Sequence, residues 1–447
     1  MYLVILIAGL TLLVAGAELL VRGASRLAAM ARISPLIIGL TVVAYGTSVP
    51  ELAVSAHASL AGEAGLAVGN VVGSNIFNVL LILGIAAIVR PLAVSARLVR
   101  LDVPIMIGTS LLLWALSANG VLGRGEGVLL LVSLVAYTAV LGILSKRYAK
   151  QQENTTPVGA PAQDPFRTRY LAANAALVLL GLSGLVFGAR WFMEGAIEVA
   201  ERLGVSHVLI GLTIVAAGTS LPELFTSVWA SIRGQRDIAV GNVIGSNIFN
   251  LLGVLGLSAV LGQGGLEVSR DVLRHDVLVM VAASIACLPI FISGATVSRI
   301  EGVLLVFYYG LYVTVLILDA IKSPMERPVS EAVAFLFLPM TALVLVMSIF
   351  ISEKHLERIL GPFADNVEIT TKRTLRQLKR LLIFTIGGTL VLIGLVMILL
   401  PGPATIVIPL GMGILATEFI WAKRLLVNTM NRARHLVSAM RNMNSNE

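Results

Sequence analysis

The sequence contains little charge and almost no cysteine. Only 13% of its 447 residues are Asp, Glu, Lys or Arg, whereas 57% are hydrophobic and the mean hydropathy is +0.92. The one cysteine, Cys287, excludes a disulfide framework and a thiol metal site within the chain. We find no nucleophile–base pair, no phosphate-binding loop and no basic surface interleaved with aromatic residues. The sequence therefore indicates neither an enzyme nor a nucleic-acid-binding protein.

Long apolar runs fill most of the chain. Runs of about 20 residues are long enough to cross the hydrocarbon core of a bilayer. The first run has no cationic leader and no small-residue cleavage signal, so we interpret it as a retained helix. Ten spans are expected in the first 322 residues, at about 2–21, 36–61, 66–89, 103–119, 126–145, 171–189, 207–232, 238–262, 276–293 and 300–319.

Two stretches inside these runs are written twice. Residues 39–51 (GLTVVAYGTSVPE) correspond to 211–223 (GLTIVAAGTSLPE), and residues 69–78 (GNVVGSNIFN) correspond to 241–250 (GNVIGSNIFN). A single offset of 172 relates all four stretches, which identifies an internal duplication. Five spans per copy is an odd number, so the two copies must insert with opposite orientations, giving an inverted-topology repeat.

Loop charges support this inversion. If the N-terminus lies outside, the loops after the first and third spans and the segment between the copies are cytoplasmic, and all three are rich in Lys and Arg. The loop around Glu63 has no Lys or Arg, and the predicted loop 190–206 balances its arginines with glutamates, so both are expected outside. We interpret Glu18 with Arg22, and the reversed pair Arg190 with Glu194, as ion pairs at helix ends.

Composition divides the chain into four parts. We assign residues 1–147 to the first repeat, 148–170 to a cytoplasmic linker and 171–322 to the second repeat. Residues 323–447 form a C-terminal membrane extension of two or three further helices with a cytoplasmic basic tail, in which 381–421 either spans twice or is re-entrant. The predicted fold is an all-α integral protein of the cell (inner or plasma) membrane.

Each repeated stretch places polar groups inside apolar sequence. Pro50 removes a helical N–H and displaces the carbonyl of Gly46, and Pro222 does the same to Gly218. Such freed carbonyls persist in lipid only where they line a polar cavity. One helical face also carries Thr47 with Glu51, or Thr219 with Glu223. The neighbouring helix supplies a polar stripe made of Asn70, Ser74 and Asn78, repeated as Asn242, Ser246 and Asn250.

This inventory consists of oxygen ligands only. Hard cations such as Ca²⁺ and Na⁺ prefer carboxylate, carbonyl, hydroxyl and amide oxygens, and two glutamates would neutralise one divalent ion. The competing interpretation is packing, because Gly-x-x-x-Gly with Ser or Asn usually marks helix contact and a lone proline usually marks a kink. A glutamate near the bilayer centre costs about 2.5–3.5 kcal/mol or more. Having Glu51 and Glu223 in matching contexts therefore favours a cation site.

These paired motifs resemble the alpha repeats of the sodium/calcium exchanger superfamily in its prokaryotic form, over about residues 1–322. The resemblance implies ten helices in two inverted halves, with alternating access to a site in the middle of the membrane. Some members have an aspartate at the position of Asn250, so this chain has two carboxylates rather than three. The ligands implied by the resemblance are Ala44 and Ala216 through their carbonyls, and Thr47, Ser48, Glu51, Ser74, Asn78, Thr219, Ser220, Glu223, Ser246 and Asn250.

The C-terminal part has a resemblance of its own. Residues 381–424 look like a family of membrane proteins marked by a Pro-Gly-Pro-Gly-Trp-type turn, here Pro401-Gly402-Pro403-Ala404. We interpret the extension as a regulatory or assembly module that could mediate self-association, and we assign it no transport residue.

The leading functional hypothesis is a secondary antiporter that exchanges Ca²⁺ for Na⁺, with no cofactor. A Ca²⁺/H⁺ antiporter is the nearest alternative and would show a pH-driven flux that is independent of Na⁺. A gated cation channel is a further alternative and would show current without a counter-ion. The partners expected are the two transported ions and the lipid bilayer, and no nucleic acid.

Overall fold

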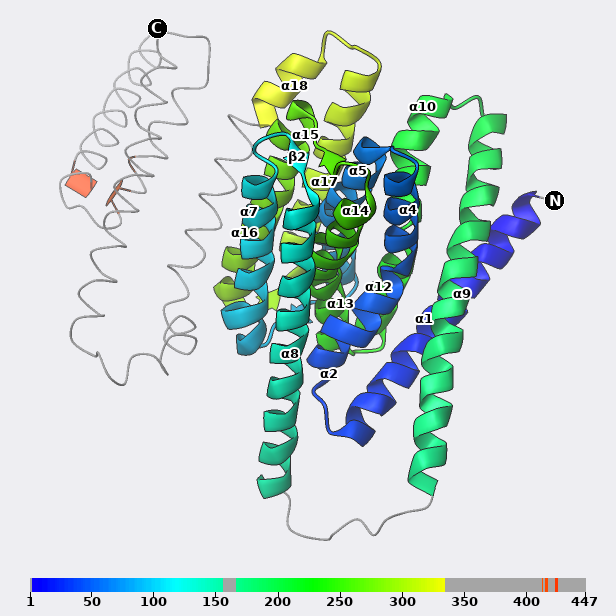
Figure 1. Cartoon of the computed structure of the whole chain (residues 1–447), viewed down its shortest axis with the longest axis vertical. Coiled ribbons are helices and arrows are strands. Elements are labelled where there is room, and N and C mark those ends of the chain that lie inside the picture. The colour runs from blue at the N-terminus through cyan, green and yellow to red at the C-terminus, as the bar shows by residue number, and fades with distance from the viewer. Residues whose placement is uncertain (1, 156–165, 334–411, 413–414, 417–422, 425–447) are drawn as a thin grey trace, which may run out of the picture. The chain divides into compact units, whose positions relative to one another are not determined.

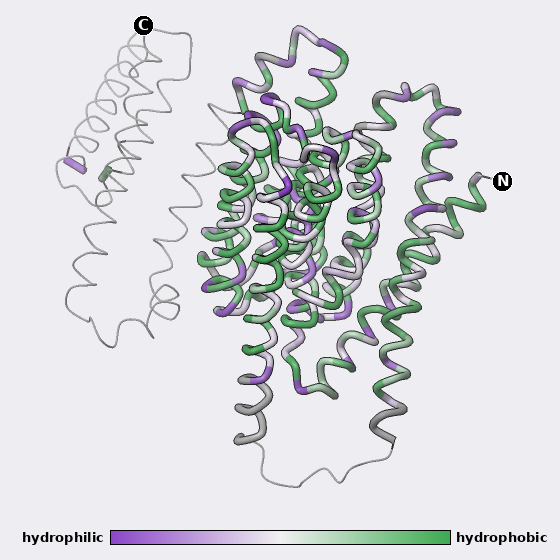
Figure 2. The backbone as a smooth tube through the Cα atoms, viewed as in Figure 1, coloured by the Kyte–Doolittle hydropathy of each residue, from purple (hydrophilic) through white to green (hydrophobic). Residues whose placement is uncertain are grey.

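The computed structural model describes residues 2–155 and 166–333, together with 412, 415–416 and 423–424. Eight helices in these ranges are by themselves long and apolar enough to cross a membrane, and a bent helix pair makes a ninth. Apolar residues dominate the middle of the helices, as Figure 2 shows. Most of the predicted C-terminal extension 323–447, including most of its basic tail, lies outside the described residues.

The first repeat follows the expected order of spans. Its elements are α1 (Tyr2–Ala31), α2 (Pro35–Ile38), η1 (Gly39–Val43), α3 (Ala44–Thr47), α4 (Val49–Leu60), α5 (Ala64–Ile76), η2 (Phe77–Ile82), α6 (Leu83–Val89), β1 (Leu92–Ala93), η3 (Leu98–Asp102), α7 (Val103–Leu116), β2 (Val121–Leu122) and α8 (Arg124–Thr155). The η segments are π-helical turns, which are frequent at functional sites.

The second repeat reproduces this order. Its elements are α9 (Phe166–Arg202), α10 (His207–Ile210), η4 (Gly211–Val215), α11 (Ala216–Gly218), α12 (Leu221–Ile232), α13 (Arg236–Phe249), η5 (Asn250–Val254), α14 (Leu255–Leu261), β3 (Leu266–Glu267), α15 (Arg270–Arg274), α16 (Asp276–Gly294), β4 (Thr296–Val297) and α17 (Arg299–Ala320), followed by α18 (Glu326–Ala332).

The predicted helix breaks are present in both repeats. The helix pair Pro35–Thr47 and Val49–Leu60 is bent by 45° at Ser48. Pro50 and Pro222 lie in the first turn of α4 and α12, where the missing N–H has no intrahelical acceptor. Each repeat therefore splits its second span into a half-helix, a short break and a second half-helix.

Two segments predicted as a loop and a linker are helical over part of their length. The segment 190–206 was expected to be a loop, but α9 continues to Arg202 and carries the (i, i+4) ion pairs Arg190–Glu194 and Arg202–Glu198. Such pairs allow a helix to continue beyond the apolar layer. α8 likewise extends to Thr155 and α9 begins at Phe166, so both enter the predicted linker.

The helices α1 and α9 lie side by side at one flank of the bundle (Figure 1). Glycines make this contact close, because a Cβ built on Gly9 would lie 2.4 Å from the backbone nitrogen of Phe192. Gly16 and Gly188 have similarly little room.

Four helices from the two repeats form the buried centre of the molecule. α4 packs on α5, and α12 packs on α13. Two short antiparallel pairs also join the repeats, with Leu92 opposite Val297 and Val121 opposite Glu267. This bundle positions every polar residue that the duplicated motifs contribute.

Candidate cation site

The two membrane-embedded glutamates lie at the centre of the bundle, and each is held by the opposite repeat. Ser48 donates a hydrogen bond to Oε1 of Glu223 at 2.8 Å, and Ser220 donates to Oε1 of Glu51 at 2.9 Å. All four side chains are fully buried. The serines lie in the helix breaks, directly before α4 and α12, so the breaks bring each hydroxyl to the other repeat's carboxylate.

Threonines and asparagines form a second set of crossed bonds. Thr47 donates to Oδ1 of Asn242 at 3.2 Å, and Thr219 donates to Oδ1 of Asn70 at 3.2 Å. Nδ2 of Asn70 donates to the carbonyl of Glu51 at 3.2 Å. The amide of Asn242 makes the equivalent bond in the second repeat at 3.4 Å. These bonds fix both breaks against the helices α5 and α13.

Several buried oxygens in this cluster have no hydrogen-bond partner among the described residues. All of them belong to the duplicated motifs that carry the two glutamates and the polar stripes. They are Glu51 Oε2, Glu223 Oε2, Asn78 Oδ1, Asn250 Oδ1 and Ser74 Oγ. A buried polar atom without a partner costs about 1–3 kcal/mol, and more when it is charged. Carboxylate, amide and hydroxyl oxygens are the ligand types that a hard cation prefers.

The cluster contains two carboxylates, those of Glu51 and Glu223. Among the residues that the structure describes, no group of three or more His, Cys, Asp or Glu side chains is placed to hold a metal ion. A cation bound here would therefore take most of its ligands from hydroxyl, amide and carbonyl oxygens.

The backbone carbonyls of Ala44 and Ala216, which the resemblance implies as ligands, lie in different surroundings. The Ala44 carbonyl is buried and accepts a hydrogen bond from Ser246 at 3.4 Å. Ala216, its counterpart, is exposed, and the Ser74 hydroxyl has no partner among the described residues. The crossed hydrogen bonds therefore connect the two breaks with the neighbouring helices, but they do not include Ala216 or the Ser74 side chain, and Thr219 is half-exposed.

Two asparagines were not predicted from the sequence. Asn75 and Asn247 are buried and bond to Asn250 and Asn78, at 3.2 and 3.0 Å. Both belong to the duplicated stretch and are separated by the same offset of 172, so the signal was present in the sequence. They lie beside the polar stripe rather than on it, so a four-residue spacing does not include them.

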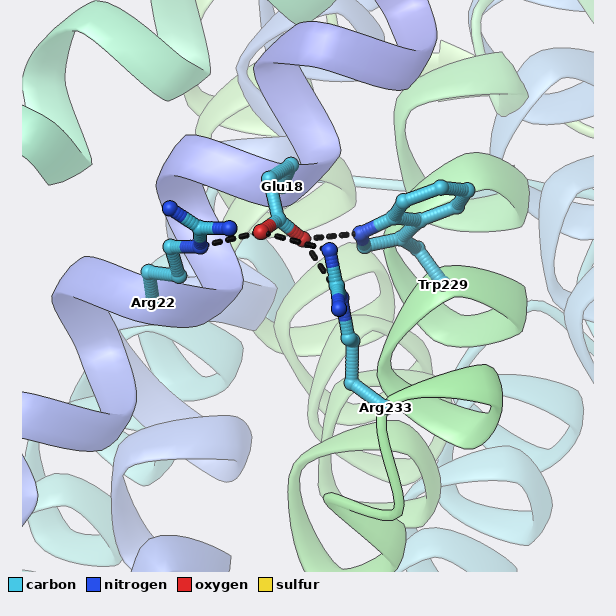
Figure 3. Close-up of polar contacts among 4 residues, drawn as sticks. All are labelled: Glu18, Arg22, Trp229 and Arg233. Atoms are coloured by element: carbon cyan, nitrogen blue, oxygen red, sulfur yellow. Dashed lines mark hydrogen bonds and ion pairs between the residues drawn. The ribbon is translucent and has the colours of Figure 1, made fainter.

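The interpretation of Glu18 and Arg22 as an ion pair at a helix end was wrong in its position, because both residues lie inside α1 (Tyr2–Ala31), and it missed the other partners of Glu18. Figure 3 shows the Glu18 carboxylate between Arg22, which is on the same helix, and two residues of the second repeat. Trp229 lies in α12, and Arg233 directly follows the end of α12. Arg233 donates two hydrogen bonds to it at 2.8 Å, and the Trp229 indole donates another. Glu18 therefore ties α1 to α12 across the repeat boundary.

Comparison with known families decides the identity of this arrangement. The profile of the family described as sodium/calcium exchanger protein matches residues 1–142 and 173–318, which is more than half of the chain. The chain belongs to the sodium/calcium exchanger family. It is therefore an integral membrane protein of a cation/Ca²⁺ antiporter family, with two inverted repeats of five spans.

Proteins from other organisms resemble it over most of their length. The sodium/calcium exchanger MaX1 of Methanosarcina acetivorans is 34% identical over 342 residues, covering 70% of this chain and 97% of MaX1. The inner membrane protein YrbG of Escherichia coli is 39% identical over 283 residues, covering 63% of this chain and 86% of YrbG.

Solved exchanger structures share the fold. The sodium–calcium exchanger NCX_Mj, soaked with zero Na⁺ and Ca²⁺, has a TM-score of 0.60 and 30% identity, covering 70% of this chain and 98% of NCX_Mj. Outside the exchanger repeats, residues 380–432 match the profile of a transmembrane protein family named PGPGW. This match confirms the second resemblance predicted from the sequence.

Proposed function

We propose that the protein is a secondary antiporter that moves Ca²⁺ across the membrane in exchange for Na⁺, without a cofactor and without enzymatic activity. The observation that carries this proposal is the set of buried, unpartnered oxygens around Glu51 and Glu223. Two carboxylates balance the charge of one Ca²⁺, and Ca²⁺ takes 6–8 oxygen ligands. The similar proteins MaX1 and NCX_Mj are both named as sodium/calcium exchangers, which supports this pair of ions.

Each predicted ligand has a defined part in this proposal. The carboxylates supply charge. Ser74 of α5 and Ser246 of α13 supply neutral oxygens, as do Asn78 of η2 and Asn250 of η5. Thr47, Ser48, Thr219 and Ser220 position the breaks and release their hydrogen bonds to allow a carboxylate to turn toward the ion. The carbonyls of Ala44 and Ala216 complete the ligand set from the two half-helices.

The asymmetry of the two half-helices supports access from one side at a time. Val43 is completely buried, whereas its counterpart Val215 is 48% exposed. The positive charge of the loops favours an outside N-terminus, with the segment between the repeats in the cytoplasm. In that orientation α10 and the exposed half-helix that follows it lie on the outer side, so we propose that access to the site is from the outside in this arrangement.

Proton exchange is the second candidate. Each glutamate has one oxygen bonded to serine and one without a partner, and the second is free to take a proton in place of a cation. Because residue 250 is an asparagine, the site has two carboxylates, which carry a charge of −2 when both are ionised. Either one Ca²⁺ or two protons neutralise this charge.

The test is Ca²⁺ uptake by purified protein in proteoliposomes loaded with Na⁺, with K⁺ or with acid. We expect uptake only into the Na⁺-loaded vesicles. Uptake that follows acid loading alone would assign the protein to Ca²⁺/H⁺ exchange, and a lack of uptake under every gradient would refute Ca²⁺ antiport.

Two glutamate variants provide the matched control for this assay. Glu223→Gln keeps the size of the side chain and an acceptor for Ser48 but removes the charge, so uptake should be lost. Glu194→Gln makes the same change on the exposed face of α9 and should transport normally.

The C-terminal extension has no part in the proposed ion site. We propose that residues 323–447 form a regulatory or assembly module, because a separate membrane family matches there and basic residues flank it. Deletion of residues 325–447 should change transport, membrane yield or oligomer size, and an unchanged value for all three would refute the proposal.

A further inference from the structure

Four asparagines from the duplicated motif meet where α5 and α13 face each other. They are Asn75 and Asn78 from the first repeat, and Asn247 and Asn250 from the second. Each is at most 1% exposed. Their contacts obey the approximate two-fold symmetry of the repeats, because each bond of one pair has a counterpart in the other.

The orientation of the Asn75 amide follows from a backbone group. Its Nδ2 lies 3.3 Å from the carbonyl of Asn247, and a carbonyl only accepts hydrogen bonds. The other end of the amide must therefore be Oδ1, which accepts a bond from Nδ2 of Asn250 at 3.2 Å. Asn250 in turn directs its own Oδ1 away from Asn75, to the buried position where it has no partner.

The second pair repeats this argument. Nδ2 of Asn247 lies 3.5 Å from the carbonyl of Asn75, and Oδ1 of Asn247 accepts from Nδ2 of Asn78 at 3.0 Å. Oδ1 of Asn78 is then the end of its amide that is buried without a partner. Two backbone carbonyls thus determine the orientation of all four side-chain amides.

We propose that Asn75 and Asn247 are positioning residues that act across the repeat boundary, Asn75 on Asn250 and Asn247 on Asn78, so that both amides present oxygen to the cation. This inference rests on the proposed cation site and deepens it. An amide that is free to turn would present its NH₂ group, whose hydrogens repel a cation. Locking the amides gives two neutral oxygen ligands beside two carboxylates, and the ligand set keeps a charge of −2.

The first test compares Ca²⁺ affinity with transport rate in the full-length protein. Asn75→Ala should raise the KM for Ca²⁺ about tenfold, which corresponds to about 1.4 kcal/mol, and should change the maximal rate much less. Asn75→Leu fills the volume without an amide and should behave in the same way, so a cavity effect is separated from loss of orientation.

A matched control comes from another buried bond between the repeats. The hydroxyl oxygens of Ser110 and Ser284 are 3.2 Å apart and join α7 to α16. Ser110→Ala removes one hydrogen bond across the repeat boundary and should leave the KM for Ca²⁺ unchanged. An equal increase in Ser110→Ala and Asn75→Ala would overturn the proposal.

The decisive measurement is a pair of double-mutant cycles on Ca²⁺ affinity. If Asn75 acts through Asn250, Asn75→Ala should have no further effect in an Asn250→Ala background. Its effect should persist in an Asn78→Ala background, although Asn78 is the nearer residue in sequence. A merely structural role predicts the reverse, with stronger coupling to the neighbour on the same helix.

A binding assay separates failure of this inference from failure of the transport proposal. The same cycles are measured by calorimetric titration of the purified protein with Ca²⁺ and with Na⁺. If the protein does not transport Ca²⁺ but its Ca²⁺ affinity still shows the coupling between Asn75 and Asn250, the antiporter proposal is refuted and the positioning role is kept. Transport without crossed coupling would refute the positioning role alone, and absence of binding by both ions would refute both.

Discussion

The half-helices that lead into the two breaks have almost the same sequence but different packing. A Cβ on Gly245 would lie 2.6 Å from the Leu40 carbonyl, and one on Gly241 would lie 2.9 Å from the Leu36 carbonyl, because α2 and η1 pack directly on α13. At the counterparts Gly69 and Gly73, an added Cβ would meet nothing within 4 Å.

In the described state α2 and η1 pack on α13, whereas the surface of α5 at Gly69 and Gly73 is open. If the second repeat came to pack as the first does, α10 and η4 would move onto this surface of α5. By symmetry with the bond between Ser246 and the Ala44 carbonyl, Ala216 would then approach Ser74, whose hydroxyl has no partner among the described residues. Equal sequences with unequal packing are what an alternating mechanism requires, because neither arrangement can be much more stable than the other.

The largest expected effect tests the part of the molecule in which the repeats are equivalent. Glu51→Gln and Glu223→Gln should each reduce Ca²⁺ uptake by on the order of 100-fold or more, because each removes half of the charge that holds the ion. Both should retain the serine hydrogen bond and a normal melting temperature. Initial rates in proteoliposomes are the measurement, and a difference of about tenfold between the two variants would show that the carboxylates are not equivalent.

The next prediction tests the part in which the repeats differ. Gly245→Ala should destabilise the protein by about 1–3 kcal/mol, because backbone atoms of η1 must move to admit the methyl group. Gly73→Ala should leave the melting temperature unchanged but slow transport about tenfold, because its methyl group obstructs docking of α10 and η4. Thermal unfolding and uptake are measured on both variants. Full transport by Gly73→Ala would mean that this surface is unused in the cycle.

A smaller effect is expected from the outer helices. Glu18 ties α1 to α12, whereas Arg190, its counterpart on α9, pairs with Glu194 of its own helix. Glu18→Gln should lower the melting temperature by about 2–4 °C, the amount expected for a loss of about 1 kcal/mol. Arg190→Gln, which removes an exposed pair, should change it by less than about 1 °C. Equal shifts would contradict the bridging role of Glu18.

The smallest effect concerns Tyr45, where the second repeat has Ala217. Its ring stacks on Phe249 at a centroid distance of 4.4 Å, and its hydroxyl lies 2.8 Å from that of Thr138. Tyr45→Phe should cost about 0.5–1 kcal/mol and Tyr45→Ala somewhat more, measured by thermal unfolding. A larger loss in Tyr45→Phe than in Tyr45→Ala would exclude this account of the residue.

The sequence predicted those features that local residue types determine. Proline and glycine mark the breaks, and a carboxylate inside an apolar run marks the site, so the repeats and Glu51 and Glu223 were found without a structure. The partner of Glu18 could not be predicted, because Arg233 lies 215 residues away and nothing in either neighbourhood specifies the pairing. Helix ends were also misjudged, because α9 continues on charged pairs beyond its apolar residues.

The sequence could not predict which of the two half-helices is buried and which is exposed, and the reason is a different one. The motif at Gly39 and the motif at Gly211 differ at only three positions, so no local property distinguishes them. The unequal exposure of Val43 and Val215 therefore depends on how the two half-helices pack against other elements.

The crossed serine–glutamate bonds have a consequence for the two copies. Since Ser48 serves Glu223 and Ser220 serves Glu51, one copy of the repeat encodes only half of each carboxylate's support. One copy alone would therefore assemble this site only as a homodimer whose subunits were inserted in opposite directions. With both copies in one chain each can differ from the other, as they do at Tyr45 and in the reversed charges of α1 and α9.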